Sequence, residues 1–93
     1  METAEWMQQV SDMCNPALAT VTVEGHGIII RGRTHGPFVA VHYANGAYTV
    51  QYRTANHTTA TFDRLSLEQV LMLTADAMRG MGFASDDNVY VLK

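Results

Sequence analysis

"FVAVHYANGAYTVQYR" spans residues 38–53 and carries the clearest structural signal in this chain. On both sides of Asn45-Gly46, apolar and polar side chains alternate, which is typical of strands with one buried face. Asn-Gly is the strongest short-range signal for a two-residue hairpin turn, because both residues adopt positive φ with little strain. The stretch therefore predicts an antiparallel pair of strands at residues 38–44 and 47–53.

Further strands flank this hairpin in the sequence. Alternating residues predict strands at 17–23 and 28–35, joined by a turn at 24–27 that contains two glycines. A fifth strand is expected at 58–62, where β-branched threonine is frequent. A short last strand is expected at 88–92. Sequential strands joined by tight turns indicate an antiparallel meander.

Two amphipathic helices are expected to cover one face of this sheet. Residues 4–14 place apolar side chains at helical spacing, and the pattern ends before Pro16 because the residue preceding a proline avoids helical dihedral angles. Residues 67–80 form a second apolar stripe, preceded by Ser66 as N-cap with Gln69 at the capping-box position. The sequence therefore predicts an α+β fold in the order α-β-β-β-β-β-α-β, with five to six strands and both helices on one face of the sheet.

Length and composition indicate one domain over residues 1–93. The chain is 47% hydrophobic, which is enough to build a core at this length. Its single cysteine, Cys14, excludes an intramolecular disulfide. The first ten residues carry acids where a secretory signal peptide would be basic, and no apolar run approaches the roughly 20 residues of a membrane span. The expected location is therefore the cytoplasm, without a membrane.

The sequence lacks the common motifs of catalysis and metal binding. It contains no nucleophile elbow, no phosphate-binding loop and no dinucleotide-binding glycine pattern. Cys14 lies on the apolar stripe of the first helix, where an inert thiol is expected. The chain has four histidines whose spacing matches no metal-binding motif: His26, His35, His42 and His57. We therefore expect no enzyme activity, no metal and no cofactor.

Strand alternation also predicts which side chains lie on the sheet face away from the helices. We expect this open face to collect threonine, arginine and histidine, with no acid. Its candidate anion-binding residues are Arg31, Arg33, His35, His42 and Arg53. Solvated arginines on strands also discourage edge-to-edge pairing, so these residues need no ligand to explain them. The tyrosines alternate to the other face, and the side of Phe62 stays unassigned, so an aromatic platform for nucleic-acid bases is not expected on the open face.

The second predicted helix carries an unusual outer side. Met72 lies opposite the apolar stripe, and its neighbours on that side are Glu68, Asp76 and Arg79. An exposed methionine between acids can serve as an adaptable contact in a protein interface. Together with a net charge of −3, this pattern favours a basic partner surface over general nucleic-acid binding.

These observations predict a small non-catalytic protein-binding module, such as an inhibitor or adaptor that occupies a partner's surface. Small acidic domains without catalytic motifs are common among phage and mobile-element inhibitors of host defence, including anti-CRISPR proteins. In that setting the partner is a nucleic-acid-binding complex in the host cytoplasm. The alternative is binding of nucleic acid or an anionic ligand on the open sheet face. The sequence also leaves open a homodimer through an unpaired edge strand.

Overall fold

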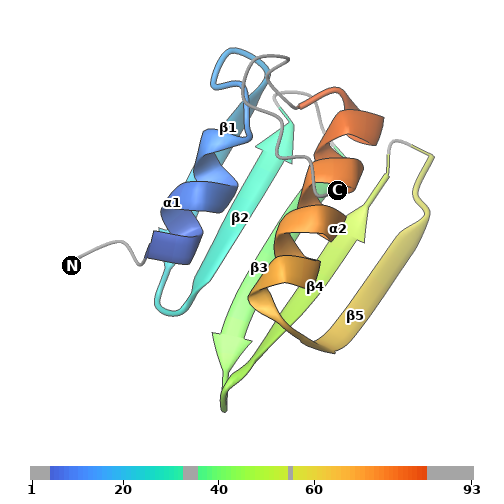
Figure 1. Ribbon diagram of the computed structural model, residues 1–93. Coiled ribbons are helices and arrows are strands. Elements are labelled where there is room, and N and C mark those ends of the chain that lie inside the picture. Colours follow the sequence, from blue (N-terminus) through green and yellow to red (C-terminus); the bar gives the residue numbers. More distant parts are fainter. Residues whose placement is uncertain (1–4, 33–35, 55, 84–93) are drawn as a thin grey trace.

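The fold is a five-stranded antiparallel sheet with two helices, seen in a computed structural model that describes residues 5–32, 36–54 and 56–83 (Figure 1). The strands lie side by side in chain order, β1-β2-β3-β4-β5. The elements are α1 (Glu5–Asp12), β1 (Ala19–Glu24), β2 (Gly27–Gly32), β3 (Phe38–Ala44), β4 (Ala47–Arg53), β5 (Thr59–Leu65) and α2 (Leu67–Met81). The predicted α+β meander is confirmed, and the strand predicted at 88–92 lies outside the described residues.

The central hairpin forms as its sequence predicts. Asn45 has φ 54° and Gly46 has φ 79°, so both turn residues lie in the left-handed region that a type I′ turn requires. The turn fixes the register of β3 and β4, in which Tyr43 pairs with Tyr48 and Val41 pairs with Val50. Paired residues share a face of the sheet, so this register aligns the apolar side chains of both strands.

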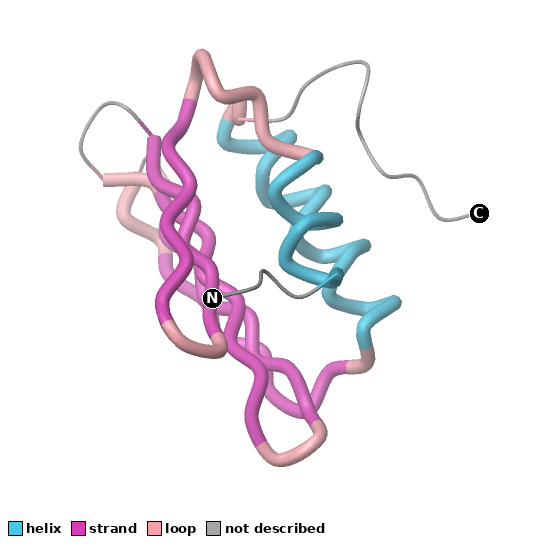
Figure 2. Tube along the Cα trace, turned by 90° about the vertical axis from the view of Figure 1, so that its left-hand side faces the viewer, coloured by secondary structure: helices cyan, strands magenta, loops and turns pink. Residues whose placement is uncertain are grey.

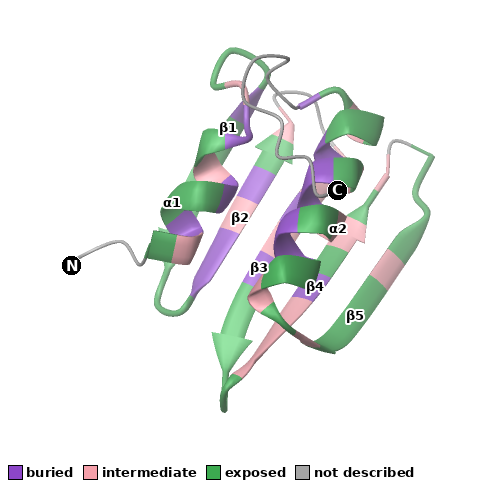
Figure 3. Cartoon of the chain, in the orientation of Figure 1, coloured by how far each residue is buried: buried purple, intermediate pink, exposed green. Residues whose placement is uncertain are grey.

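Both helices lie on the same side of the sheet (Figure 2). The core forms between the two layers. Five strand residues in it are at most 1% exposed: Ile28, Ile30, Val39, Val41 and Val50. The helices contribute three fully buried side chains to the same core, which are Val10 of α1 and Val70 and Met78 of α2. Figure 3 shows this buried stripe running along β2, β3 and the inner side of α2. Burial of this apolar surface is the main term that stabilises the fold.

The ends of α2 are capped at both termini. The Ser66 side chain accepts a hydrogen bond from the Gln69 backbone N–H, and the Gln69 side chain accepts one from the Ser66 N–H at 2.9 Å. This is the predicted capping box, which satisfies N–H groups that have no partner inside the helix. At the other end, Gly82 adopts φ 79°, so it is the C-cap, whereas Gly80 lies within the helix.

Among the described residues, three element boundaries differ from those predicted by two residues or more. The first helix ends at Asp12 instead of residue 14. The first strand begins at Ala19 instead of residue 17, because the Asn15 C=O accepts the N–H groups of Leu18 and Ala19 in a turn. The fifth strand continues past residue 62 to Leu65, across a register shift opposite β4. Among the described helices, none has the length and apolar character needed to cross a membrane.

The helical layer is narrower than the sheet. The α1 helix packs on β2, and α2 packs mainly on β3 and β4, so the helix-side faces of β1 and β5 are left at the margins (Figure 1). Val21 and Val23 of β1 are accordingly 37% and 40% exposed, and Phe62 of β5 is 37% exposed. The helix side of the sheet therefore stays exposed at both margins.

Candidate functional site

The first candidate site is the outer side of α2, which we call the α2 surface and define by Glu68, Met72, Asp76 and Arg79. All four residues are exposed, and Met72 is 48% exposed. Arg79 Nη1 lies 3.5 Å from Asp76 Oδ1. Both side chains of this ion pair are more than half exposed, and pairs of this kind contribute about 0–1 kcal/mol. The Asp76 carboxylate can therefore exchange Arg79 for a cation of a partner at little cost.

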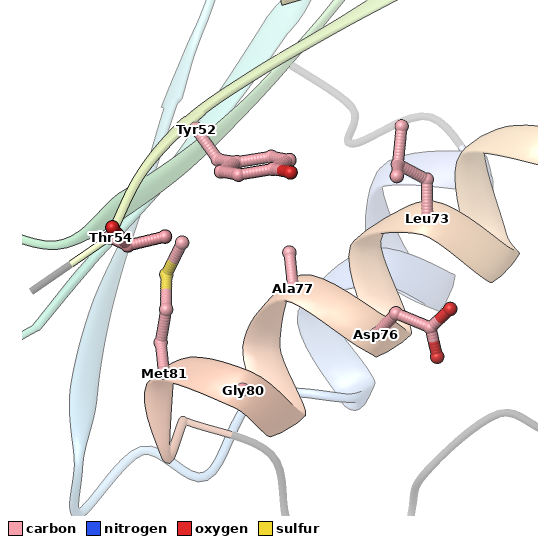
Figure 4. A pocket seen from close by; sticks show the side chains of 7 residues that line it. All are labelled: Tyr52, Thr54, Leu73, Asp76, Ala77, Gly80 and Met81. Carbon is pink, nitrogen blue, oxygen red and sulfur yellow. The ribbon is translucent and has the colours of Figure 1, made fainter. Parts of the chain in front are cut away.

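An apolar pocket of about 260 Å³ lies beside the α2 surface (Figure 4). The pocket lies between the end of β4 and the second half of α2. Its lining residues are Tyr52, Thr54, Leu73, Asp76, Ala77, Gly80 and Met81. In Figure 4 the Tyr52 ring lies across from Leu73 and Ala77, while Met81 lies next to Thr54. Asp76 belongs both to this pocket and to the α2 surface.

The pocket exists because α2 carries small side chains on the side that faces the margin of the sheet. Ala77 fills little space, and a Cβ atom added at Gly80 would meet no heavy atom within 4 Å. The Tyr52 ring stacks on Phe62 of β5 with centroids 6.0 Å apart, which keeps the ring beside the uncovered strand. The volume is below the range of drug-sized ligand sites and suits one apolar side chain. Sequence periodicity places Ala77 on the apolar stripe, but it does not reveal the gap beside it.

Exposed acids accumulate on the helical layer. Glu5 and Asp12 of α1 and Glu68 and Asp76 of α2 are all exposed, and Arg79 is the one basic residue of the two helices. The Gln8 side-chain amide donates to Asp12 at 2.8 Å, which leaves the charge of that carboxylate in place. This side of the molecule is therefore acidic, as the sequence pattern suggests.

The second candidate site lies at one end of the open sheet face. Arg31, Phe38 and Arg53 pair with one another in a row across β2, β3 and β4. The Arg31 guanidinium carbon lies 5.8 Å from the centre of the Phe38 ring, which is a cation–π distance. The predicted site residues Arg33 and His35 lie outside the described residues. The alternation of the tyrosines did not point to Phe38, which is half-buried on this face between the two arginines of the ladder. Phe62, whose side was unassigned, lies on the helix side.

The expectation that the open face lacks acids is wrong. The Thr49 hydroxyl donates to Asp63 Oδ1 at 3.2 Å, so the extension of β5 brings this carboxylate onto the face. Glu24 lies on the same face at the end of β1, where it pairs with Gly27. His42 pairs with both Gly27 and Thr49, and it is four residues, or about 13 Å, along β3 from Phe38. The open face therefore has a basic end and an acidic end.

The remaining reactive group is the thiol of Cys14. This free cysteine is buried, and burial raises the pKa of its thiol. A neutral buried thiol is a poor nucleophile. Within residues 5–32, 36–54 and 56–83, no three His, Cys, Asp or Glu side chains gather in a way that could hold a metal ion.

Comparison of the chain with protein-family models, with curated proteins and with solved structures gives no significant match. The described part of the chain thus offers two candidate sites: an acidic α2 surface that adjoins an apolar pocket, and an Arg-Phe-Arg row on the open sheet face.

Proposed function

We propose that this protein is a small non-catalytic protein-binding module that uses the α2 surface and the adjoining pocket to bind a basic segment of another protein. The observation that carries this proposal is the position of Asp76. Its carboxylate is exposed on the α2 surface, and the same residue belongs to the lining of the apolar pocket, so the charge lies at the pocket's rim (Figure 4). A segment with one apolar side chain next to a lysine or arginine matches this arrangement, because the apolar group fills the pocket while the cation approaches Asp76.

The two parts of the site contribute differently to binding. Burial of one large apolar side chain contributes about 1.5–3 kcal/mol, whereas an exposed ion pair contributes about 0–1 kcal/mol. The pocket therefore supplies most of the affinity, and the acids of the helical layer steer a basic partner and disfavour an acidic one. Met72, exposed between Glu68 and Asp76, adds an adaptable apolar contact next to both charges.

The specific form of this proposal is an inhibitor of phage or mobile-element origin, of the anti-CRISPR type, that acts in the cytoplasm of a host cell. The target would be a nucleic-acid-binding complex, because such complexes expose basic channels for the phosphate backbone. The acidic helical layer supports this form, since it presents four exposed carboxylates and a single arginine. Occupation of such a channel blocks nucleic acid without any chemical step.

Affinity capture with matched charge variants tests the proposal. The tagged protein and the double variant Glu68→Lys/Asp76→Lys are used to capture proteins from source cells. The control, Glu5→Lys/Asp12→Lys, makes the same charge change on α1. We expect the bound proteins to disappear with the α2 variant and to persist with the α1 variant. Equal capture by both variants, or loss with both, would contradict a specific role of the α2 surface.

A second candidate function is binding of nucleic acid or another anionic ligand at the Arg-Phe-Arg row. The position of Phe38 between Arg31 and Arg53 in the ladder favours it, because an aromatic ring among arginines can contribute to stacking of a base while the arginines contact phosphates. The two acids at the other end of the same face weigh against a long nucleic-acid track, so the ligand would be short.

Fluorescence anisotropy with short single-stranded DNA and RNA tests this second function. If the row binds them, affinity falls steeply with added salt and is lost in Arg31→Ala/Arg53→Ala. Thr20→Ala, on the same face, serves as the control and should bind like the unaltered protein. Absence of binding at low salt removes this function.

A further inference from the structure

The two edges of the sheet differ in how they are protected against pairing with another strand. The β1 edge is regular over Ala19–Glu24, and its register with β2 has no irregularity. It carries alternating threonine and valine, no lysine, arginine or proline, and one charge at its end. Edge strands normally carry such charges, prolines or bulges, because a bare edge pairs readily with another strand.

The free hydrogen-bonding groups of β1 can be assigned from the ladder. Gly32 N–H donates to Pro37 C=O and Tyr43 N–H donates to His26 C=O, so the even-numbered residues of β2 bond to β3. The odd-numbered residues of β2 then bond to β1, where their partners are even-numbered. Val21 and Val23 consequently direct their N–H and C=O groups away from the sheet.

We propose that two copies of this chain pair antiparallel through their β1 edges, about a two-fold axis at Thr22. In this register Val21 of each copy lies opposite Val23 of the other, so only outward-directed N–H and C=O groups are joined. A two-fold axis at Val21 would instead require the Ala19 N–H, which already donates to the Asn15 C=O. The axis at Thr22 therefore joins only groups that point away from β2 and that have no partner among residues 5–32, 36–54 and 56–83.

The side chains of β1 are self-complementary in this register. On the helix side, Val21 and Val23 are 37% and 40% exposed, and each would be covered by the other valine of the second copy. On the open face, Thr20 of each copy lies opposite Glu24 of the other, so each carboxylate meets a hydroxyl group and no like charges face each other. Cross-strand pairs of this kind contribute roughly 0.2–1 kcal/mol each.

The β5 edge explains why assembly would stop at two copies. The ladder between β4 and β5 contains an irregularity between Tyr48 and Val50, and Arg64 adopts φ 59°. Asp63 and Arg64 also place two charges near the end of this strand. A bulged, charged edge resists further pairing, so β1-to-β1 contact gives a closed dimer rather than a growing fibre.

This inference goes beyond the proposed function and does not depend on it. The α2 surface and its pocket lie toward the β5 side of the molecule, away from β1 (Figure 1). Both copies would therefore keep a free site, and the dimer would bind a repeated or symmetric partner with two sites at once.

Sedimentation velocity over a wide range of concentration tests the dimer on the full chain. The expected particle has twice the 10.3 kDa mass of one chain and dissociates on dilution. Val21→Lys should raise the dimer dissociation constant by about tenfold or more, since it puts a solvated cation into the valine pair. The control Thr61→Lys, on the exposed β5 edge, should leave it within about twofold.

Amide hydrogen exchange completes the test and needs no variant. In the dimer, the Val21 and Val23 amides should exchange slowly, and dilution to the monomer should speed both. A chain that remains monomeric at high concentration would overturn the proposal. So would a dimer that Val21→Lys leaves intact while circular dichroism shows the native fold, or a monomer whose Val21 and Val23 amides are protected by another segment of the same chain.

Discussion

Ile29 and Ile30 are neighbours in β2, yet they lie on faces of the sheet with different physical roles. Ile30 is completely buried beneath the helices, whereas Ile29 is half-buried on the open face. The covered face gains stability from apolar contact with α1 and α2, and the outer side of those helices is acidic. The open face is solvated and carries two arginines and two acids at opposite ends. One layer of helices thus decides both where the core lies and which charge a partner meets.

The largest effect should come from truncating each isoleucine in turn. Ile30→Ala removes a fully buried side chain, so we expect a loss of about 2–5 kcal/mol in the free energy of unfolding. Ile29→Ala, in the same strand and with the same chemistry, should cost no more than about 1.5 kcal/mol, because the open face can relax and hydrate. Urea denaturation followed by circular dichroism measures both. Equal costs would mean that the open face is covered in solution.

A smaller effect should follow from loosening α2, the helix that covers β3 and β4. Ser66→Ala removes the side-chain acceptor for the Gln69 N–H, so we expect a loss of about 1 kcal/mol. Thr59→Ala, an exposed substitution on the open face of β5, is the control and should change stability by no more than about 0.5 kcal/mol. Thermal unfolding compares the two, and an unchanged midpoint for Ser66→Ala would show that the cap does not hold α2 on the sheet.

The thiol on the helix side provides a probe of burial that depends on pH. Because burial raises the pKa of Cys14, its thiolate is scarcer in the folded than in the unfolded protein at mildly alkaline pH. We expect slow reaction with a disulfide reagent near pH 8 and fast reaction in urea. The stability that the neutral thiol contributes is full below about pH 8.5 and is lost as pH rises through the raised pKa. Fast reaction of the native protein would contradict the burial of Cys14 in the segment that follows α1.

The smallest effect concerns the charge balance of the open face. Removing its acids with Glu24→Gln/Asp63→Asn leaves Arg31 and Arg53 unopposed, while fold stability should change little because both acids are exposed. We expect this variant to gain weak binding to single-stranded nucleic acid at low salt, which added salt abolishes. Anisotropy measures the gain relative to the unaltered chain. If binding does not change, the acids are too far from the arginines to oppose them.

The fold was predictable from local sequence because several independent signals agree. The Asn45-Gly46 turn, the alternation of β3 and β4 and the Ser66 cap each specify geometry within a few residues, and the structure contains all three. Alternation also assigned the faces of β1 to β4, whereas the side of Phe62 in β5 stayed unassigned. These features depend on short-range dihedral preferences and on side-chain period, which a single sequence displays directly.

The details of the candidate sites depend on longer-range geometry. Phe38 follows Pro37, and alternation alone does not show that its neighbours across the sheet are Arg31 and Arg53. Asp63 reaches the open face because β5 extends past residue 62, and this extension contains Arg64 with positive φ, which no turn motif marks. The pocket depends on where α2 crosses β4, which is set by packing of the whole core.

Binding of a basic segment to the α2 surface and its pocket can be followed by nuclear magnetic resonance. A short synthetic peptide with one leucine flanked by arginines is titrated into the labelled protein, beside a matched peptide with glutamates in place of the arginines. We expect saturable shifts at Leu73, Ala77 and Gly80 for the arginine peptide only. Gly80→Leu, which fills the pocket from a position where an added Cβ meets no atom within 4 Å, should abolish them. Shifts that persist in Gly80→Leu, that map to the open face, or that do not distinguish the two peptides would contradict it.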